Sequence, residues 1–95
     1  MFILSLTYTA PLDAVDALLP DHLAWLGAGR DAGKLLAWGR KVPRTGGMIF
    51  AALDSRAETE VLAASDPFIT GGVATVEVIE FSASFAGPGL EALGQ

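Results

Sequence analysis

The sequence contains no cysteine and only one histidine, His22. Without cysteine the chain can form no disulfide and carry out no thiolate chemistry, which fits a reducing compartment such as the cytoplasm. A single histidine without cysteine cannot build the usual zinc site, and the carboxylates do not follow the spacing of a calcium-binding EF-hand loop. The sequence therefore predicts no metal site.

Positive charge is scarce as well, because six Lys and Arg residues face eleven Asp and Glu residues and the net charge is −5. A nucleic-acid partner would require a basic face, so we expect none. No apolar run approaches the roughly 20 residues that cross a bilayer. The first residues, Met1 to Leu4, have no basic region typical of a signal peptide. We expect a cytoplasmic protein with no membrane association.

Phosphate-binding loops and nucleophilic motifs are also missing. Gly27-Ala28-Gly29 falls within a helical pattern, and Gly46-Gly47 precedes a strand, whereas a phosphate-binding glycine loop precedes a helix. No serine stands in a nucleophile motif. We therefore predict that the protein uses no nucleotide cofactor and no other cofactor.

Apolar residues are abundant: they make up 52% of the 95 residues. This length indicates a single domain, residues 1–95, with a Gly/Pro-rich end at residues 86–95 that is free to form an extended tail. So high an apolar content in a small chain favours the burial of some surface against another copy.

The hydrophobic periodicity predicts four strands, at Phe2–Tyr8, Lys34–Arg40, Met48–Leu53 and Val73–Phe81. Pro11 favours a helical start after the first strand. Pro20 divides that segment into a short turn ending near Leu19 and a helix over residues 21–32, with Gly33 as its left-handed cap. Ser55 and Glu58 form a capping-box pattern for a further helix, which ends before Pro67.

This β-α-β-β-α-β order predicts an α+β fold, in which an antiparallel sheet carries two helices on one face. The second and third strands are apolar on both sides, which is typical of strands buried on both faces. Two helices can cover only one face. We therefore predict a homodimer in which the sheets of two copies pack together with two-fold symmetry.

His22 and Asp66 are the candidate catalytic pair. His22 lies at the flank of a helical apolar arc centred on Leu19, Leu23 and Leu26, and Asp66 occupies a turn held by Pro67 before the fourth strand. The first and fourth strands are commonly neighbours in this fold, so both side chains can reach one end of a cleft.

A carboxylate bonded to one ring nitrogen would leave the other free to move a proton on a substrate. Two simpler interpretations remain open. His22 can be a satisfied core or rim residue, and Asp-Pro is a common turn opener.

Five further residues are weaker candidates for a substrate pocket: Tyr8, Trp25, Trp38, Arg40 and Phe68. Arg40, Lys41 and Arg44 crowd the connection between the second and third strands, where they could steer or clamp an anion. They could equally form a solvated connection that protects strand edges. The two tryptophans could serve core or dimer packing rather than a ligand.

Four short motifs resemble those of the YciI-like (YCII-related) proteins, and the resemblance spans Phe2 to Phe81. In chain order they are His22-Leu23-Ala24-Trp25-Leu26, Ala32-Gly33-Lys34-Leu35-Leu36, Gly46-Gly47 and Asp66-Pro67-Phe68. The resemblance implies a ferredoxin-like protomer that forms a dimeric α+β barrel. It also implies an active site made by His22 and Asp66. This chain has Gly39-Arg40 where many relatives have Gly-Pro, which adds a charge near the expected cleft.

The resemblance does not define a reaction. A related dehydrochlorinase suggests acid–base chemistry on small aromatic or cyclic molecules, and other proteins with this barrel include muconolactone isomerases and cofactor-free monooxygenases. We therefore predict a protein of lyase or isomerase type in which His22, oriented by Asp66, acts as general acid and base on a small cyclic or anionic molecule. The alternatives are a non-catalytic dimer that binds a small ligand or regulates, and an accessory domain in which both residues are only structural.

Overall fold

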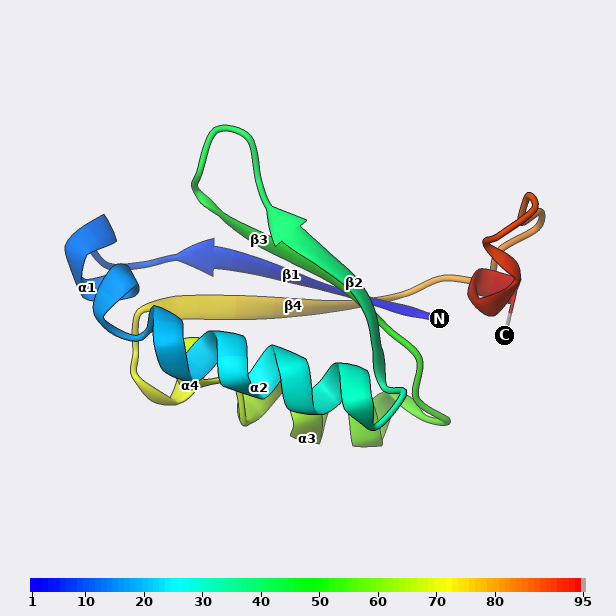
Figure 1. Ribbon diagram of the computed structural model, residues 1–95, viewed down its shortest axis with the longest axis horizontal. Coiled ribbons are helices and arrows are strands. Elements are labelled where there is room, and N and C mark those ends of the chain that lie inside the picture. Colours follow the sequence, from blue (N-terminus) through cyan, green and yellow to red (C-terminus); the bar gives the residue numbers. More distant parts are fainter. Residues whose placement is uncertain (95) are drawn as a thin grey trace.

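The computed structural model describes residues 1–94, which form one antiparallel sheet with helices on one of its faces (Figure 1). The elements in chain order are β1 Phe2–Tyr8, α1 Leu12–Ala17, α2 Leu19–Asp31, β2 Leu35–Arg40, β3 Gly46–Ala51, α3 Arg56–Ala64, α4 Pro67–Thr70, β4 Ala74–Glu80 and the 3₁₀ helix η1 Glu91–Gly94. The strand order β2-β3-β1-β4 confirms the predicted ferredoxin-like α+β fold.

Alternation along β1 separates the two faces of the sheet. Phe2, Leu4 and Leu6 are each at most 2% exposed and form the core, while Ile3 and Ser5 between them point to the opposite face. Figure 1 shows α2 and α3 on the same side of the sheet, where they cover this core. Because β1 lies between β3 and β4, its helix-facing residues form the centre of the domain.

The first crossover follows the prediction from its prolines. Helix α1 ends before Leu18, and Pro20 stands in the first turn of α2, where its missing N–H breaks no helical hydrogen bond. Beyond α2, Gly33 has φ +73°, the left-handed conformation expected of a glycine after a helix. Two prolines and one glycine thus set the bounds of this connection.

Strand β3 begins and ends two residues earlier than predicted. The sequence predicts that Gly46 and Gly47 lie just before the strand, in a turn-prone connection, but they pair with Thr7 and Leu6 of β1. A Cβ at Gly46 would collide with the Leu6 carbonyl group, so this glycine allows a close approach of two backbones. Glycine-rich composition alone did not distinguish a turn from such a paired position.

The Asp66 segment is a helix start, and the predicted simple turn was wrong. Asp66 is extended, with φ −60° and ψ 128°, as the following proline requires, and Pro67 then opens the single-turn helix α4. The Asp66 carboxylate accepts the Phe68 backbone N–H at 2.9 Å and caps this helix. By contrast, the predicted Ser55 cap of α3 is confirmed, since its Oγ accepts the Glu58 N–H at 3.1 Å.

The face of the sheet away from the helices carries apolar side chains that the single chain leaves uncovered. Ile3 pairs with Phe50 and Ile79, and Met48, two residues before Phe50 in β3, lies on the same face. Met48 and Ile79 are both 37% exposed. In Figure 1 the segment after β4 runs beyond the sheet, and residues 91–94 form η1 instead of an extended tail. Gln95, the last residue of the expected tail, lies outside the described residues.

Candidate active site

A cavity of about 160 Å³ lies between α2, α4 and the helix-facing side of β1, β2 and β3. Its polar or aromatic wall residues are Tyr8, His22, Trp38, Arg40 and Phe68. Its other wall residues are Leu6, Leu19, Leu23, Leu26, Gly39, Gly47 and Ile49. The cavity is therefore largely apolar and has a few polar groups, as is typical of a small-molecule site.

His22 and Asp66 meet at this cavity although 44 residues separate them in the chain. The His22 Nδ1 atom lies 2.7 Å from Asp66 Oδ1, the oxygen that also accepts the Phe68 N–H. A carboxylate oxygen accepts hydrogen bonds, so Nδ1 is the donor and carries the ring proton. The other ring nitrogen, Nε2, is then the one available to a ligand.

Aromatic contacts hold the His22 ring in one orientation. The ring stacks on Phe68, with the centroids 3.8 Å apart and the planes 8° apart, and lies nearly parallel to Trp25 at 6.1 Å. Tyr8 meets Phe68 edge to face at 6.0 Å. Since Asp66 and Phe68 are both within the segment Ser65–Phe68, one short stretch supplies the oxygen that bonds the imidazole and the ring that stacks on it.

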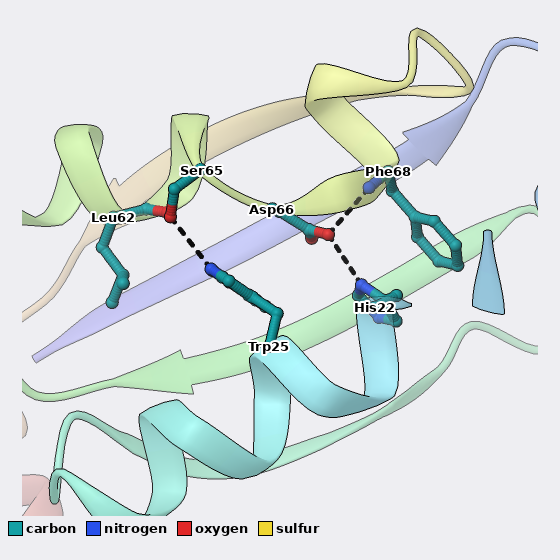
Figure 2. A network of polar contacts seen from close by, with 6 residues as sticks. All are labelled: His22, Trp25, Leu62, Ser65, Asp66 and Phe68. Atoms are coloured by element: carbon teal, nitrogen blue, oxygen red, sulfur yellow. Dashed lines mark hydrogen bonds and ion pairs between the residues drawn. The ribbon is translucent and has the colours of Figure 1, made fainter. Parts of the chain in front are cut away.

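A third contact fastens Ser65–Phe68 to α2. The Trp25 indole N–H donates to Ser65 Oγ at 2.9 Å, and the Ser65 hydroxyl donates to the Leu62 carbonyl at 2.6 Å. Figure 2 shows His22 and Trp25 pointing from α2 toward this segment. They are three residues apart, so they lie on the same face of the helix and can contact one segment together.

The pair is well shielded from water. His22 is 9% exposed and Asp66 is 1% exposed. Asp66 Oδ2 is buried and has no hydrogen-bond partner among residues 1–94, so the contacts of the carboxylate all pass through Oδ1. Bonds made in such surroundings are stronger than those at an exposed surface.

The three basic residues predicted for this connection have different surroundings: Arg40 is the last residue of β2, whereas Lys41 and Arg44 follow it. Arg44 donates to Asp16 Oδ1 of α1 at 2.6 Å and lies over the Tyr8 ring at 5.7 Å. This hydrogen bond is the main reason that the pKa of Asp16 is below its ordinary value of 3.8. Lys41 donates to Thr7 Oγ1 at 3.4 Å, while Arg40 lines the cavity.

The structure brings most of the predicted site residues together. The predicted residues that line the cavity beside His22 are Tyr8, Trp38, Arg40 and Phe68. Trp25 and Asp66 are not wall residues, and Asp66 contacts the Nδ1 atom of His22. Sequence reasoning expected leucine side chains in the walls but named none of them as site residues, although it placed three, Leu19, Leu23 and Leu26, on one helical arc beside His22. That shared arc was the signal for these walls.

Two searches of the described residues gave negative results. In residues 1–94, no group of three or more His, Cys, Asp or Glu side chains could hold a metal ion. Within the same range, no helix has both the length and the apolar character needed to cross a bilayer.

The sequence profile of the YCII-related domain family matches residues 1–82. The chain belongs to this family. No curated protein matches the sequence. The YCII-related domain thus covers the sheet and its helices, and the match ends just after β4.

A solved structure with the same fold is the 5-chloro-2-hydroxyhydroquinone dehydrochlorinase of Burkholderia phenoliruptrix, in complex with 2,5-dihydroxybenzoquinone. It is 20% identical to this chain and superposes with a TM-score of 0.71 over 86% of this chain and 94% of the dehydrochlorinase. This similarity shows that the YCII-related domain described here shares the fold of that enzyme.

Proposed function

We propose that this YCII-related domain is an enzyme in which His22 is a general acid and base acting on a small cyclic molecule. Asp66 orients the imidazole. The observation that carries the proposal is the 2.7 Å contact between His22 Nδ1 and Asp66 Oδ1 at the wall of an apolar cavity. With Nδ1 held as the donor, Nε2 can take a proton from a substrate and return it to another atom.

The size of the cavity supports a substrate with a single ring. An apolar cavity of about 150 Å³ in another protein binds benzene, and the cavity here measures about 160 Å³. Trp38 and Phe68 add flat apolar surface to its walls. The dehydrochlorinase with this fold was solved with a dihydroxylated quinone, and so hydroxylated rings are the first substrates to test.

The reaction we propose is of lyase or isomerase type and uses no metal or nucleotide cofactor. In an isomerisation, one residue can remove a proton beside a carbonyl group and return it to another atom of the substrate. In an elimination, the same residue removes the proton while the bond to the leaving group breaks and the leaving group departs with its electron pair. Histidine is suited to this task near neutral pH. Asp66 supports it by fixing the tautomer in which Nε2 is the acceptor.

We also propose that the protein is a cytoplasmic homodimer that associates through the uncovered sheet face. The support is the exposed apolar surface around Met48 and Ile79, which a second copy would bury. The absence of cysteine is compatible with a reducing compartment.

The catalytic proposal can be tested by hydrogen exchange at carbon. The protein is incubated in D₂O with 2,5-dihydroxybenzoquinone and a panel of other small hydroxylated rings, and the loss of ring C–H signals is followed by ¹H NMR. We expect wild-type protein to accelerate exchange of at least one ring. His22→Gln and Asp66→Asn should reduce the acceleration by about 10²- to 10⁴-fold, the usual contribution of general acid–base catalysis.

Asp21→Asn is the matched control, since it removes an exposed carboxylate next to His22 and should leave exchange unchanged. Full exchange rates in both site variants would overturn the assignment. If wild-type protein binds a ring without accelerating exchange, the non-catalytic alternative holds. The deep burial of His22 between aromatic rings is the observation that favours this alternative.

A further inference from the structure

Arg40 is the cation at the wall of the cavity, and we propose that it selects a substrate bearing an anionic oxygen group, such as a carboxylate. The ring of such a substrate would occupy the apolar cavity, and its anionic group would accept hydrogen bonds from the guanidinium. This inference rests on the proposed function for the reaction, but the binding preference that it predicts can be measured without any turnover.

The first argument is that the Arg40 guanidinium is not occupied by the protein. Within residues 1–94, Arg40 makes no side-chain hydrogen bond and no ion pair. Its cross-strand partner is Gly47, which has no side chain to cover it, and both residues line the cavity. A guanidinium has five N–H donors, and here they are free to bind a ligand.

The second argument is that the neighbouring basic residues are already engaged. Arg44 donates to Asp16 at 2.6 Å and Lys41 donates to Thr7, and neither residue lines the cavity. Asp16 is the carboxylate of α1 that interacts with these cations: its Oδ1 atom accepts from Arg44, and the charge of Arg40 also helps to lower its pKa without an ion pair between the two residues. Of these three cations, Arg40, the last residue of β2, is thus the one placed to meet a ligand.

The third argument is the composition of the other cavity walls. Besides Arg40, the residues there with ionisable side chains are Tyr8 and His22, and neither has a carboxyl group. No carboxylate lines the cavity, and Asp16, whose charge interacts with that of Arg40, is hydrogen-bonded to Arg44. In a chain of net charge −5, this wall offers an anion a favourable position.

Benzoate and benzamide test the proposal, because both are planar single rings of nearly the same shape and differ in charge. Dissociation constants are measured by NMR titration at low salt, with the Trp38 indole N–H as the reporter. We expect wild-type protein to bind benzoate roughly ten- to a hundred-fold more tightly than benzamide, because hydrogen bonds to a charged group are stronger than hydrogen bonds between neutral groups. Arg40→Gln should lower this preference to about one-fold and keep the affinity for benzamide.

Lys41→Gln is the matched control, because it removes one positive charge from a residue that is next to Arg40 but does not line the cavity. It should keep most of the preference for benzoate, and Arg40→Lys should keep part of it, since an ammonium retains the charge without the planar fork. Three results would each overturn the proposal. The first is an Arg40→Gln protein that prefers benzoate as strongly as wild type does. The others are an equal affinity of wild-type protein for both rings and no detectable binding of benzoate.

Titrations of His22→Gln separate this proposal from the proposed function. If the preference for benzoate persists in that variant, Arg40 selects anions whether or not His22 is catalytic. If hydrogen exchange depends on His22 but the preference does not depend on Arg40, the catalytic proposal stands and the anion proposal fails.

Discussion

Asp66 Oδ1 has two partners that belong to different parts of the fold. It accepts the Phe68 N–H and so caps α4, and it bonds the His22 imidazole on α2. The cap is local chemistry, typical of an Asp before a proline at a helix start. The bond to His22 joins the two crossovers of the fold, so the same oxygen accepts two hydrogen bonds.

Comparing two substitutions of Asp66 separates these roles. Asp66→Ala removes both bonds, and we expect it to lower the free energy of unfolding by about 2–4 kcal/mol, the sum of a lost cap and a buried donor left without a partner. Asp66→Asn keeps an oxygen for the Phe68 N–H, so the free energy of unfolding should fall by less, about 1 kcal/mol. Urea unfolding at one fixed protein concentration measures both values.

Asp21→Ala is the control for this comparison, because Asp21 is exposed, and its change should stay within about 0.5 kcal/mol. An Asp66→Ala protein as stable as wild type would show that the two bonds do not contribute to folding.

At the scale of the elements, Arg44 links the connection between β2 and β3 to α1. The connection lies next to the site, since Arg44 bonds Asp16 and lies over the Tyr8 ring, which is itself a cavity wall. The Asp16 side chain is 51% exposed, so this ion pair contributes only modestly to stability at neutral pH. Its effect has a distinct dependence on pH.

The sign of that dependence follows from the lowered pKa of Asp16. The folded protein holds Asp16 ionised at lower pH than the unfolded chain, so the ion pair stabilises the fold above about pH 3.8. That stabilisation disappears as the pH falls through the lower pKa of the folded state. We expect Asp16→Asn to be less stable than wild type at pH 6, and the difference in the free energy of unfolding to shrink as the pH falls below 3.8, as measured by urea unfolding.

Asp21→Asn serves again as the control, because the Asp21 carboxylate makes no ion pair among residues 1–94. A difference between wild type and Asp16→Asn that stays constant from pH 6 to pH 3 would contradict the assignment.

At the scale of the whole molecule, the sheet has one covered and one open face. The helices bury Leu4 and Ile49, while Ile3, Phe50 and Ile79 lie side by side on the open face. An apolar surface on a sheet this small is typical of an interface with a second copy. The proposed homodimer would double the core of a domain that has only 95 residues.

The dimer can be tested with one substitution on the open face. We expect light scattering to give wild-type protein about twice the chain mass of 9.8 kDa at micromolar concentration. Ile79→Glu should shift the mass to that of a single chain, because a dimer would bury two unpaired carboxylates. Val61→Glu on α3 is the matched control, since Val61 is 73% exposed on the helical side, and it should leave the mass unchanged. A monomeric wild-type protein would refute the sheet-to-sheet dimer.

The sequence by itself determined the features that depend on neighbouring residues. Alternation defined the buried face of β1, Pro20 and Gly33 set the bounds of α2, and Ser55 marked the start of α3. Each of these signals acts within a few residues, through backbone hydrogen bonds and the direction of successive side chains. The fold class could also be predicted, because the order β-α-β-β-α-β is typical of the split βαβ arrangement.

Only the tertiary structure decided which side chains meet. It brought His22 within 2.7 Å of Asp66, paired Arg44 with Asp16 and left Arg40 at the cavity. The sequence made His22 and Asp66 candidate neighbours, but it did not distinguish among the three basic residues of one loop. The physical reason is that long side chains choose partners by geometry across elements, to within about an ångström, and residue type and spacing along the chain do not encode this geometry.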